Sequence, residues 1–142
     1  MAAEPESLDL GDIFASAEPA VVPKVEFHFV DYERAAPNAS LRLQMVKKHA
    51  LWGDHLWNGG RWLARHLDAQ PDLVKDKLVA ELGAGAGLPS IVACSLGAKR
   101  VICTDFPDRE LIDNIATNFT VNCPGSLESG QALAKVSENE ND

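Results

Sequence analysis

Residues 78–87 of this chain read Leu-Val-Ala-Glu-Leu-Gly-Ala-Gly-Ala-Gly, and this stretch decides the fold. The run from Leu78 to Leu82 has the length and apolar character of a short buried strand. Three alternating glycines follow it, and a helical pattern begins near Leu88 and Pro89, where a proline in the first turn sacrifices no hydrogen bond. The order strand, glycine turn, helix predicts the start of an α/β sheet with a ligand-binding loop.

A second unit of the same kind follows immediately. The glycine at position 97 is expected to end the first helix. A strand is predicted over residues 100–104, ending on Asp105, and a helix then runs to Asn122. One face of that helix is apolar, with Leu111, Ile112, Ile115 and Phe119 at helical spacing. Strand, helix, strand, helix predicts a parallel sheet with right-handed connections.

The segment before residue 50 alternates apolar and polar residues, as strands do. The apolar positions are Val25, Phe27 and Phe29, then Leu41, Leu43 and Met45. A Pro37-Asn38 turn signal separates the two sets. We expect a β-hairpin that packs on a larger domain and has no chemistry of its own.

A helix is predicted between the hairpin and the first strand of the sheet. Leu56, Leu63 and Leu67 recur at helical spacing, Asn58 could cap the first turn, and the helix would end near Pro71. Three tryptophans fall in this region, and core packing is the expected role of Trp62.

Composition bounds the class of protein. With 46% hydrophobic and 24% charged residues, the 142-residue chain resembles one globular domain. We expect an acidic, flexible leader over residues 1–23, the folded part over residues 24–123, and a polar tail over residues 124–142.

Charge and cysteine usage point to a reducing, cytoplasmic compartment and away from nucleic acid. A net charge of −8 disfavours a phosphate-binding surface and suits a basic or neutral partner. Cys94, Cys103 and Cys123 are odd in number and lack paired spacing, so buried reduced thiols are expected. The N-terminus has no signal-peptide pattern, and no apolar stretch is long enough to span a membrane.

The spacing of the glycines separates two classes of ligand. A dinucleotide-binding loop requires a small residue at position 88, which is Leu88 here. Glu81, two residues before Gly83, could organise the loop or meet a cationic amino group, whereas a phosphate would gain nothing from its negative charge. S-adenosylmethionine (AdoMet) carries an ammonium and a sulfonium and no phosphate, so it fits this loop better than NAD does. The alternative is that Gly83, Gly85 and Gly87 only permit a tight turn.

Asp105 ends the second strand, where a carboxylate can accept hydrogen bonds from both ribose hydroxyls of an adenosine ligand. NAD would make the same demand, and a strand-ending turn before Pro107 is the structural alternative. No general base, hydrolytic triad or zinc site is legible in the sequence.

Beyond these motifs, the chain resembles the seven-strand AdoMet-dependent methyltransferases of the lysine-methyltransferase-like group. Within that group it is most similar to the fungal enzymes that methylate the N-terminal glycine and adjacent lysine of elongation factor 1-alpha. The stretches that carry the resemblance are residues 51–53, 56–60, 64–68, 71–75, 81–84, 88–90 and 104–108, together with Leu111, Ile112 and Asn114.

The resemblance implies a Rossmann-like fold, AdoMet as cofactor and a protein substrate. It also implies that Trp57 contacts AdoMet, that Gly83, Ala84 and Gly85 form the cofactor loop, and that Asp105 binds the ribose. The alternatives are a methyltransferase for a small amine such as nicotinamide and a fragment without activity.

Members of the family continue beyond the second helix with further strands, so the resemblance covers a fold cut off after its second βα unit. The family's sheet order leaves the first strand without the neighbour that forms one wall of the ligand crevice. An apolar parallel strand at an edge exposes unpaired N–H and C=O groups. We therefore expect these 142 residues alone to fold poorly and to bind AdoMet weakly.

Overall fold

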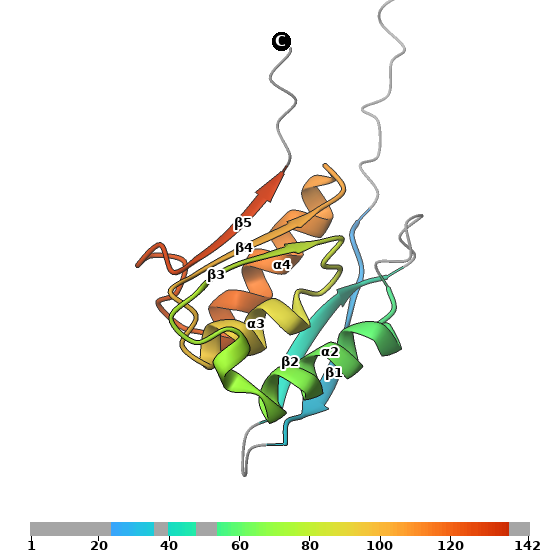
Figure 1. The fold of residues 1–142 in the computed structure, drawn as a ribbon. Helices are drawn as coiled ribbons and strands as arrows, with labels where there is room; N and C mark the ends of the chain where they lie inside the picture. Colours follow the sequence, from blue (N-terminus) through green and yellow to red (C-terminus); the bar gives the residue numbers. More distant parts are fainter. Residues whose placement is uncertain (1–23, 36–39, 48–53, 137–142) are drawn as a thin grey trace, which may run out of the picture.

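The computed structural model describes residues 24–35, 40–47 and 54–136, and Figure 1 shows their arrangement. The Pro37-Asn38 turn and Trp52 lie outside the described residues. The elements are β1 (Phe27–Glu33), β2 (Ser40–Val46), α2 (Asn58–Ala69), η1 (Pro71–Leu73), β3 (Leu78–Leu82), α3 (Leu88–Ser95), β4 (Arg100–Asp105), α4 (Arg109–Asn122) and β5 (Ala132–Val136).

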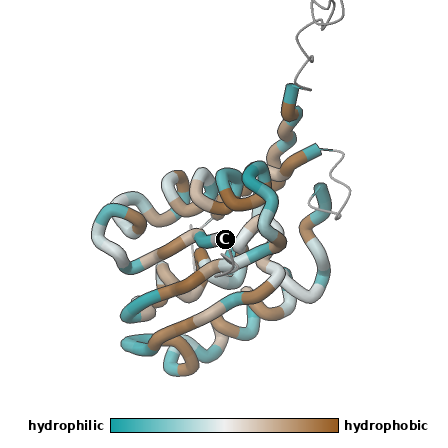
Figure 2. The backbone as a smooth tube through the Cα atoms, turned by 90° about the horizontal axis from the view of Figure 1, so that it is seen from above, coloured by the Kyte–Doolittle hydropathy of each residue, from teal (hydrophilic) through white to brown (hydrophobic). Residues whose placement is uncertain are grey.

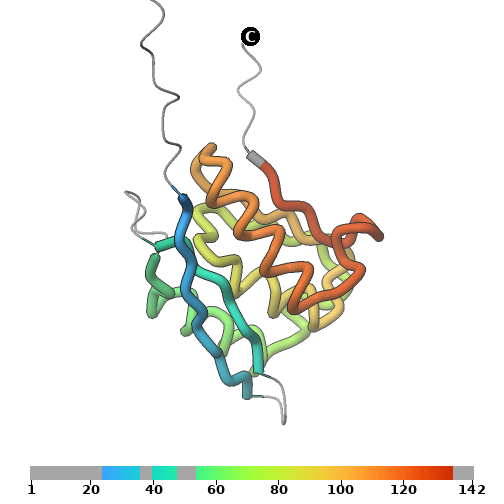
Figure 3. Tube along the Cα trace, turned by 180° about the vertical axis from the view of Figure 1, so that it is seen from behind, coloured from blue at the N-terminus to red at the C-terminus, as the bar shows by residue number. Residues whose placement is uncertain are grey.

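Strands β3, β4 and β5 form a parallel sheet in that order, as the alternation of strands and helices predicts. Val101 and Cys103 of β4 are fully buried, and they face α3 and α4, which lie together on one side of the sheet (Figures 1 and 3). Hydrophobic residues are concentrated in the strands, with hydrophilic turns between them (Figure 2). The expected α/β class is confirmed.

The sheet extends one strand further than the sequence indicated. Residues 124–142 were expected to be a polar tail, yet Ala132–Val136 pair in parallel with β4 as β5. Ala132 is completely buried, and Gln131 donates from its side-chain amide to the carbonyls of Cys94 and Ala98. The strand escaped prediction because its inward positions are alanines, which give a weak apolar pattern.

The expected hairpin is confirmed, with β1 and β2 antiparallel in a register that pairs Tyr32 with Leu41. In β1, however, the buried face is not the one that the alternation of Val25, Phe27 and Phe29 predicted. Phe27 and Phe29 are exposed, whereas Tyr32 is buried against the core. Leu41, Leu43 and Met45 of β2 are buried at alternate positions, and they fix this register because each turns inward together with its partner on β1.

An asparagine ladder joins the hairpin to α4. Asn114, Asn118 and Asn122 recur every four residues, so they share one face of the helix. Asn118 accepts from Gln44 N–H at 2.7 Å and donates to Gln44 C=O at 2.9 Å, and Asn122 makes the same pair of bonds to Arg42 at 3.0 Å each. Side-chain amides thereby satisfy backbone groups of β2 that would otherwise form an unpaired strand edge.

The ends of α3 and α4 carry the residue types expected at helix ends, whereas the predicted cap of α2 is wrong. Asp108 caps α4 by accepting from Glu110 N–H at 2.8 Å. Gly97 adopts a left-handed conformation just after α3, as predicted for a helix stop. Asn58, expected to cap α2, is instead its first residue, and Trp57 occupies the cap position without a side-chain capping bond. No helix among the described residues has the length and apolarity to cross a membrane.

The other face of the sheet is open. Leu78 and Leu82 of β3 are 75% and 82% exposed, and Ile102 of β4 is 37% exposed. Within the described part of the chain, β3 pairs only with β4, so its second edge is free. Parallel sheets normally have both faces covered, which makes this face the least completed part of the fold.

Candidate cofactor site

The glycine loop leaves β3 at the carboxyl end of the sheet and returns into α3. Gly83, Gly85 and Gly87 all have positive φ angles, of 66°, 57° and 76°. Side chains rarely tolerate this conformation, so alternate glycines are required for the turn itself. A Cβ atom added at Gly83 or Gly85 would meet nothing within 4 Å, so the space beside these two residues is open.

Asp105 holds the loop from the end of β4. Its Oδ2 accepts from Gly85 N–H at 2.5 Å, and its Oδ1 accepts from Phe106 N–H at 2.6 Å. Ala84 N–H donates to the carbonyl of Thr104 at 3.1 Å, so the loop is attached to β4 at two successive amides. The strand-ending carboxylate of Asp105 therefore contacts the glycine loop directly.

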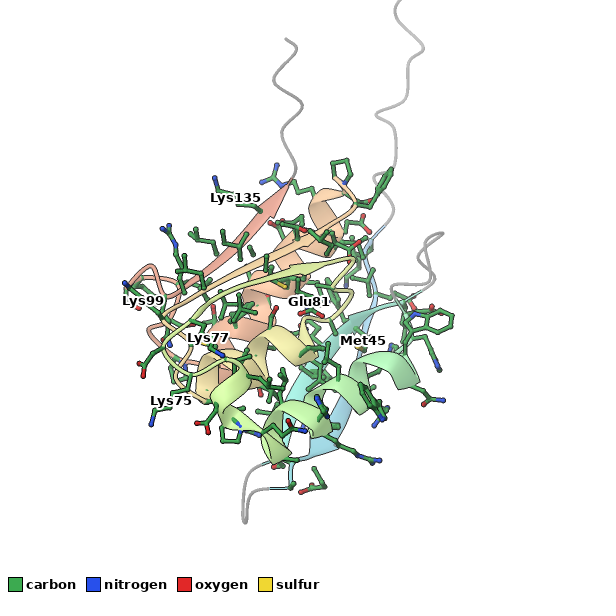
Figure 4. The ribbon with its side chains drawn as sticks, viewed as in Figure 1. Met45, Lys75, Lys77, Glu81, Lys99 and Lys135 are labelled. Atoms are coloured by element: carbon green, nitrogen blue, oxygen red, sulfur yellow. The ribbon has the colours of Figure 1, made fainter. Side chains whose placement is uncertain are left out.

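Glu81 lies beneath the loop, between β3 and α3 (Figure 4). Its Oε2 accepts from Ser90 N–H at 2.9 Å and also from the Ser90 hydroxyl. Burial raises the pKa of Glu81, and the hydrogen bonds from Ser90 oppose that rise. Of the two roles considered for Glu81, the observed contacts are those of a residue that organises the loop, because they tie β3 to the first turn of α3.

A cleft of about 160 Å³ opens beside the loop. It brings together five of the six residues proposed from the sequence, namely Trp57, Glu81, Gly83, Ala84 and Gly85. Asp105 is not among the residues that line it, although it contacts the loop through Gly85. Ligand pockets usually have volumes of about 300–1,000 Å³, so the cleft that the described residues form is smaller than this range.

Trp57 and Trp62, near and on α2, are exposed and not packed in the core. Trp57 is 55% exposed and meets His55 edge-on, with ring centroids 5.2 Å apart. Trp62, expected in the core, is 65% exposed and stacks on His66 at 5.0 Å. The core-packing prediction for Trp62 is wrong, because Ala64 and Leu67 define the buried side of α2 and Trp62 lies outside it.

Sequence reasoning missed two residues that support the site. Ser90, which binds Glu81, stands in an apolar helical run; the resemblance includes residues 88–90 but gave Ser90 no role. Asn118 donates to the carbonyl of Ala86 in the glycine loop at 3.0 Å. Its signal was available, because a polar residue on the same side of a helix as Ile115 and Phe119 requires buried hydrogen-bond partners.

The fold and the loop define the class of protein. A parallel sheet with a glycine loop between strand and helix, an acidic residue beneath that loop and a carboxylate at the next strand end belongs to the nucleoside-cofactor-binding α/β proteins. A family model described as "Lysine methyltransferase" matches residues 35–136, and the chain belongs to this family.

Relatives in fungi carry similar sequences. "Protein N-terminal and lysine N-methyltransferase EFM7" of Kluyveromyces lactis is 44% identical over 130 residues, which are 87% of this chain and 48% of that protein. The protein of the same name in Schizosaccharomyces pombe is 54% identical over 78 residues, covering 55% of this chain and 31% of that protein. This chain therefore spans about half the length of the relatives it matches.

A solved structure shares the fold. It is the crystal structure of a Pyrococcus horikoshii protein named a "putative RNA methyltransferase". The two chains superpose with a TM-score of 0.51 and 28% identity, over 68% of this chain and 45% of that one. The expected methyltransferase-type fold is confirmed by this likeness.

Proposed function

We propose that this protein is an AdoMet-dependent protein N-methyltransferase that modifies the N-terminal glycine and the adjacent lysine of elongation factor 1-alpha. The observation that carries the proposal is the 44% identity, over 87% of the chain, to a relative named as a protein N-terminal and lysine methyltransferase. Three free, buried thiols suit a reducing compartment, so we place the reaction in the cytoplasm.

The architecture of the loop supports AdoMet as the cofactor. Gly83, Ala84 and Gly85 offer a surface without bulky side chains, and Trp57 flanks the same cleft. Asp105, at the strand end, would accept hydrogen bonds from the ribose hydroxyls. Glu81 adds a negative charge close to the loop, which suits a cationic cofactor and disfavours a phosphate.

Methyl transfer needs alignment and a neutral amine. AdoMet would supply the methyl group: the amine lone pair would form the new N–C bond as the S–C bond breaks, with S-adenosylhomocysteine as the leaving group and loss of a proton from the amine. An α-amino group of pKa about 7.7–8.0 is roughly a quarter neutral near pH 7.4, whereas a lysine of pKa about 10.4 is about a thousandth neutral. An N-terminal amine is therefore the easier substrate, and a lysine would require desolvation at the site.

Radiolabelled methyl transfer tests the proposal. The protein at its natural length should label elongation factor 1-alpha from AdoMet, with label in the N-terminal peptide. Asp105→Asn should reduce AdoMet affinity by about tenfold to a hundredfold, because the second carboxylate acceptor is lost. Asp113→Asn, on the exposed side of α4, is the matched control and should leave the reaction unchanged.

The outcomes separate the alternatives. Label in nicotinamide and not in the protein would assign a small-amine methyltransferase. Binding of AdoMet without transfer to any protein would contradict the substrate proposal, and absence of AdoMet binding would contradict the cofactor as well.

A further inference from the structure

We propose that Asn118 is a positioning residue that fixes the cofactor loop by fastening one of its peptide groups to the β-hairpin. The inference rests on the proposed function, because it assigns Asn118 a purpose in AdoMet binding. It adds that the hairpin, expected only to pack on the domain, supports the loop.

Asn118 connects three separate parts of the chain. It is 1% exposed and lies on α4, and its Nδ2 donates to Gln44 C=O at 2.9 Å and to Ala86 C=O at 3.0 Å. Its Oδ1 accepts from Gln44 N–H at 2.7 Å. Both amide hydrogens and the carbonyl oxygen are therefore engaged, and an apolar side chain of similar size could not replace these bonds.

The bond to Ala86 holds a particular peptide plane. The same plane carries Gly87 N–H, which donates to Ala84 C=O at 2.8 Å. This peptide is therefore bound at both of its polar ends, by the loop itself and by α4. Since the neighbouring amide of Gly85 is held by Asp105, the loop is restrained from two sides and presents a fixed surface to the cleft.

The other two asparagines of the ladder show that hairpin attachment alone does not explain Asn118. Asn114 is 2% exposed and also donates to Gln44 C=O, at 2.9 Å, while Asn122 bridges the backbone of Arg42. The side chain of Asn122 also donates to Asn118 C=O within α4, at 2.8 Å. The bond to Ala86 is made by Asn118. Asn114 is accordingly a control matched in burial and in hairpin contact.

Glycine-loop conformation sets the entropy cost of binding a cofactor. A loop already held in its binding conformation loses little freedom when the ligand enters, whereas a loosened loop must be ordered at the expense of affinity. Loss of the bond from Asn118 should therefore raise KM for AdoMet with little change in KM for the acceptor protein.

The test compares Asn118→Ala with Asn114→Ala in the protein at its natural length. We expect Asn118→Ala to weaken S-adenosylhomocysteine binding by about tenfold, and to speed hydrogen exchange of the Gly85 and Gly87 amides without ligand by a similar factor. Asn114→Ala should lower overall stability to a comparable degree and leave loop exchange and affinity close to those of the parent protein.

Each outcome bears on one claim. Equal affinity and equal loop exchange in both variants would overturn the role of Asn118 while leaving the proposed function intact. If the loop loosens only in Asn118→Ala but the protein binds no S-adenosyl compound, AdoMet is contradicted as the cofactor, and the role of Asn118 in fixing the loop is supported. If Asn118→Ala does not fold, Asn118→Ser is measured instead. Failure of both beside a folded Asn114→Ala would contradict the proposal by showing that Asn118 holds the whole domain.

Discussion

The two faces of the β3-β4-β5 sheet differ in how completely they are covered. On the helical face, Val101 and Cys103 are fully buried beneath α3 and α4, and α4 is hydrogen-bonded to the hairpin. On the other face, Leu78 and Leu82 of β3 are mostly exposed. The difference shows that burial among the described residues is confined to the helical face of the sheet, and that the opposite face of β3 is uncovered among them.

The largest expected effect compares the same substitution on the two sides. Leu88→Ala, at a completely buried position of α3, should lower the free energy of unfolding by about 2–5 kcal/mol. Leu82→Ala, at a position 82% exposed, should change it by no more than about 0.5 kcal/mol. Urea denaturation of residues 1–142 measures both, once circular dichroism has established that this chain folds. A cost at Leu82 equal to that at Leu88 would show that the open face is covered in solution.

Cofactor affinity provides the next comparison. We expect residues 1–142 alone to bind S-adenosylhomocysteine at least about a hundredfold more weakly than a chain extended to the length of the relatives. The reason is that a cleft walled on one side cannot bury most of the ligand surface. Calorimetric titration measures the difference, with circular dichroism to establish whether the shorter chain folds. Low-micromolar binding by residues 1–142 would contradict the expected difference between the two chains.

Glycine substitutions separate backbone strain from cofactor contact. Gly85→Ala places a side chain at φ 57°, which should cost about 1–2 kcal/mol of stability, and its Cβ would occupy the open space beside the loop. Gly125→Ala, at φ 79° with open space and far in sequence from the loop, should cost about the same. Only Gly85→Ala should also weaken S-adenosylhomocysteine binding, and equal affinities in the two variants would remove Gly85 from the site.

How far the sequence could predict this molecule depends on the kind of signal each part carries. The loop could be predicted from local features, because a turn and a ligand place local requirements on the sequence. These features are the glycine spacing, the acidic residue before it and the strand-ending Asp105. The third strand was missed because Ala132 and Ala134 are small, and burial by close packing against α4 leaves no apolar pattern. Trp62 was misplaced because a large aromatic side chain can lie on a surface that the described residues leave uncovered.

The supports of the site were harder to predict, since they join segments distant in sequence. Ser90 is nine residues from Glu81, and Asn118 is 32 residues from Ala86. A hydrogen bond of this kind follows from tertiary packing and not from any spacing rule, although buried asparagines on an apolar helix face indicate that some partner must exist.

The smallest expected effect concerns the charge of Glu81 and depends on pH. Burial raises the pKa of Glu81 above its ordinary value of 4.5, so the folded state retains a proton that the unfolded state has already released. The stability of the parent protein should therefore fall as pH rises from the unfolded pKa through the folded pKa. Glu81→Gln keeps a carbonyl oxygen to accept from Ser90 and carries no charge, so it should lack this fall and be the more stable protein at pH 7.

Thermal denaturation between pH 4 and pH 7 measures the difference, and Asp113→Asn, on the exposed surface of α4, is the control for loss of a carboxylate. The stabilities of the parent protein and of Glu81→Gln, plotted against pH, should converge at acid pH, where Glu81 is protonated in both the folded and the unfolded state. A variant that is less stable at pH 7 would mean that the bonds from Ser90 to a charged carboxylate outweigh its burial. If the variant is more stable yet binds S-adenosylhomocysteine more weakly, the charge beneath the loop is retained for the cofactor at a cost to the fold.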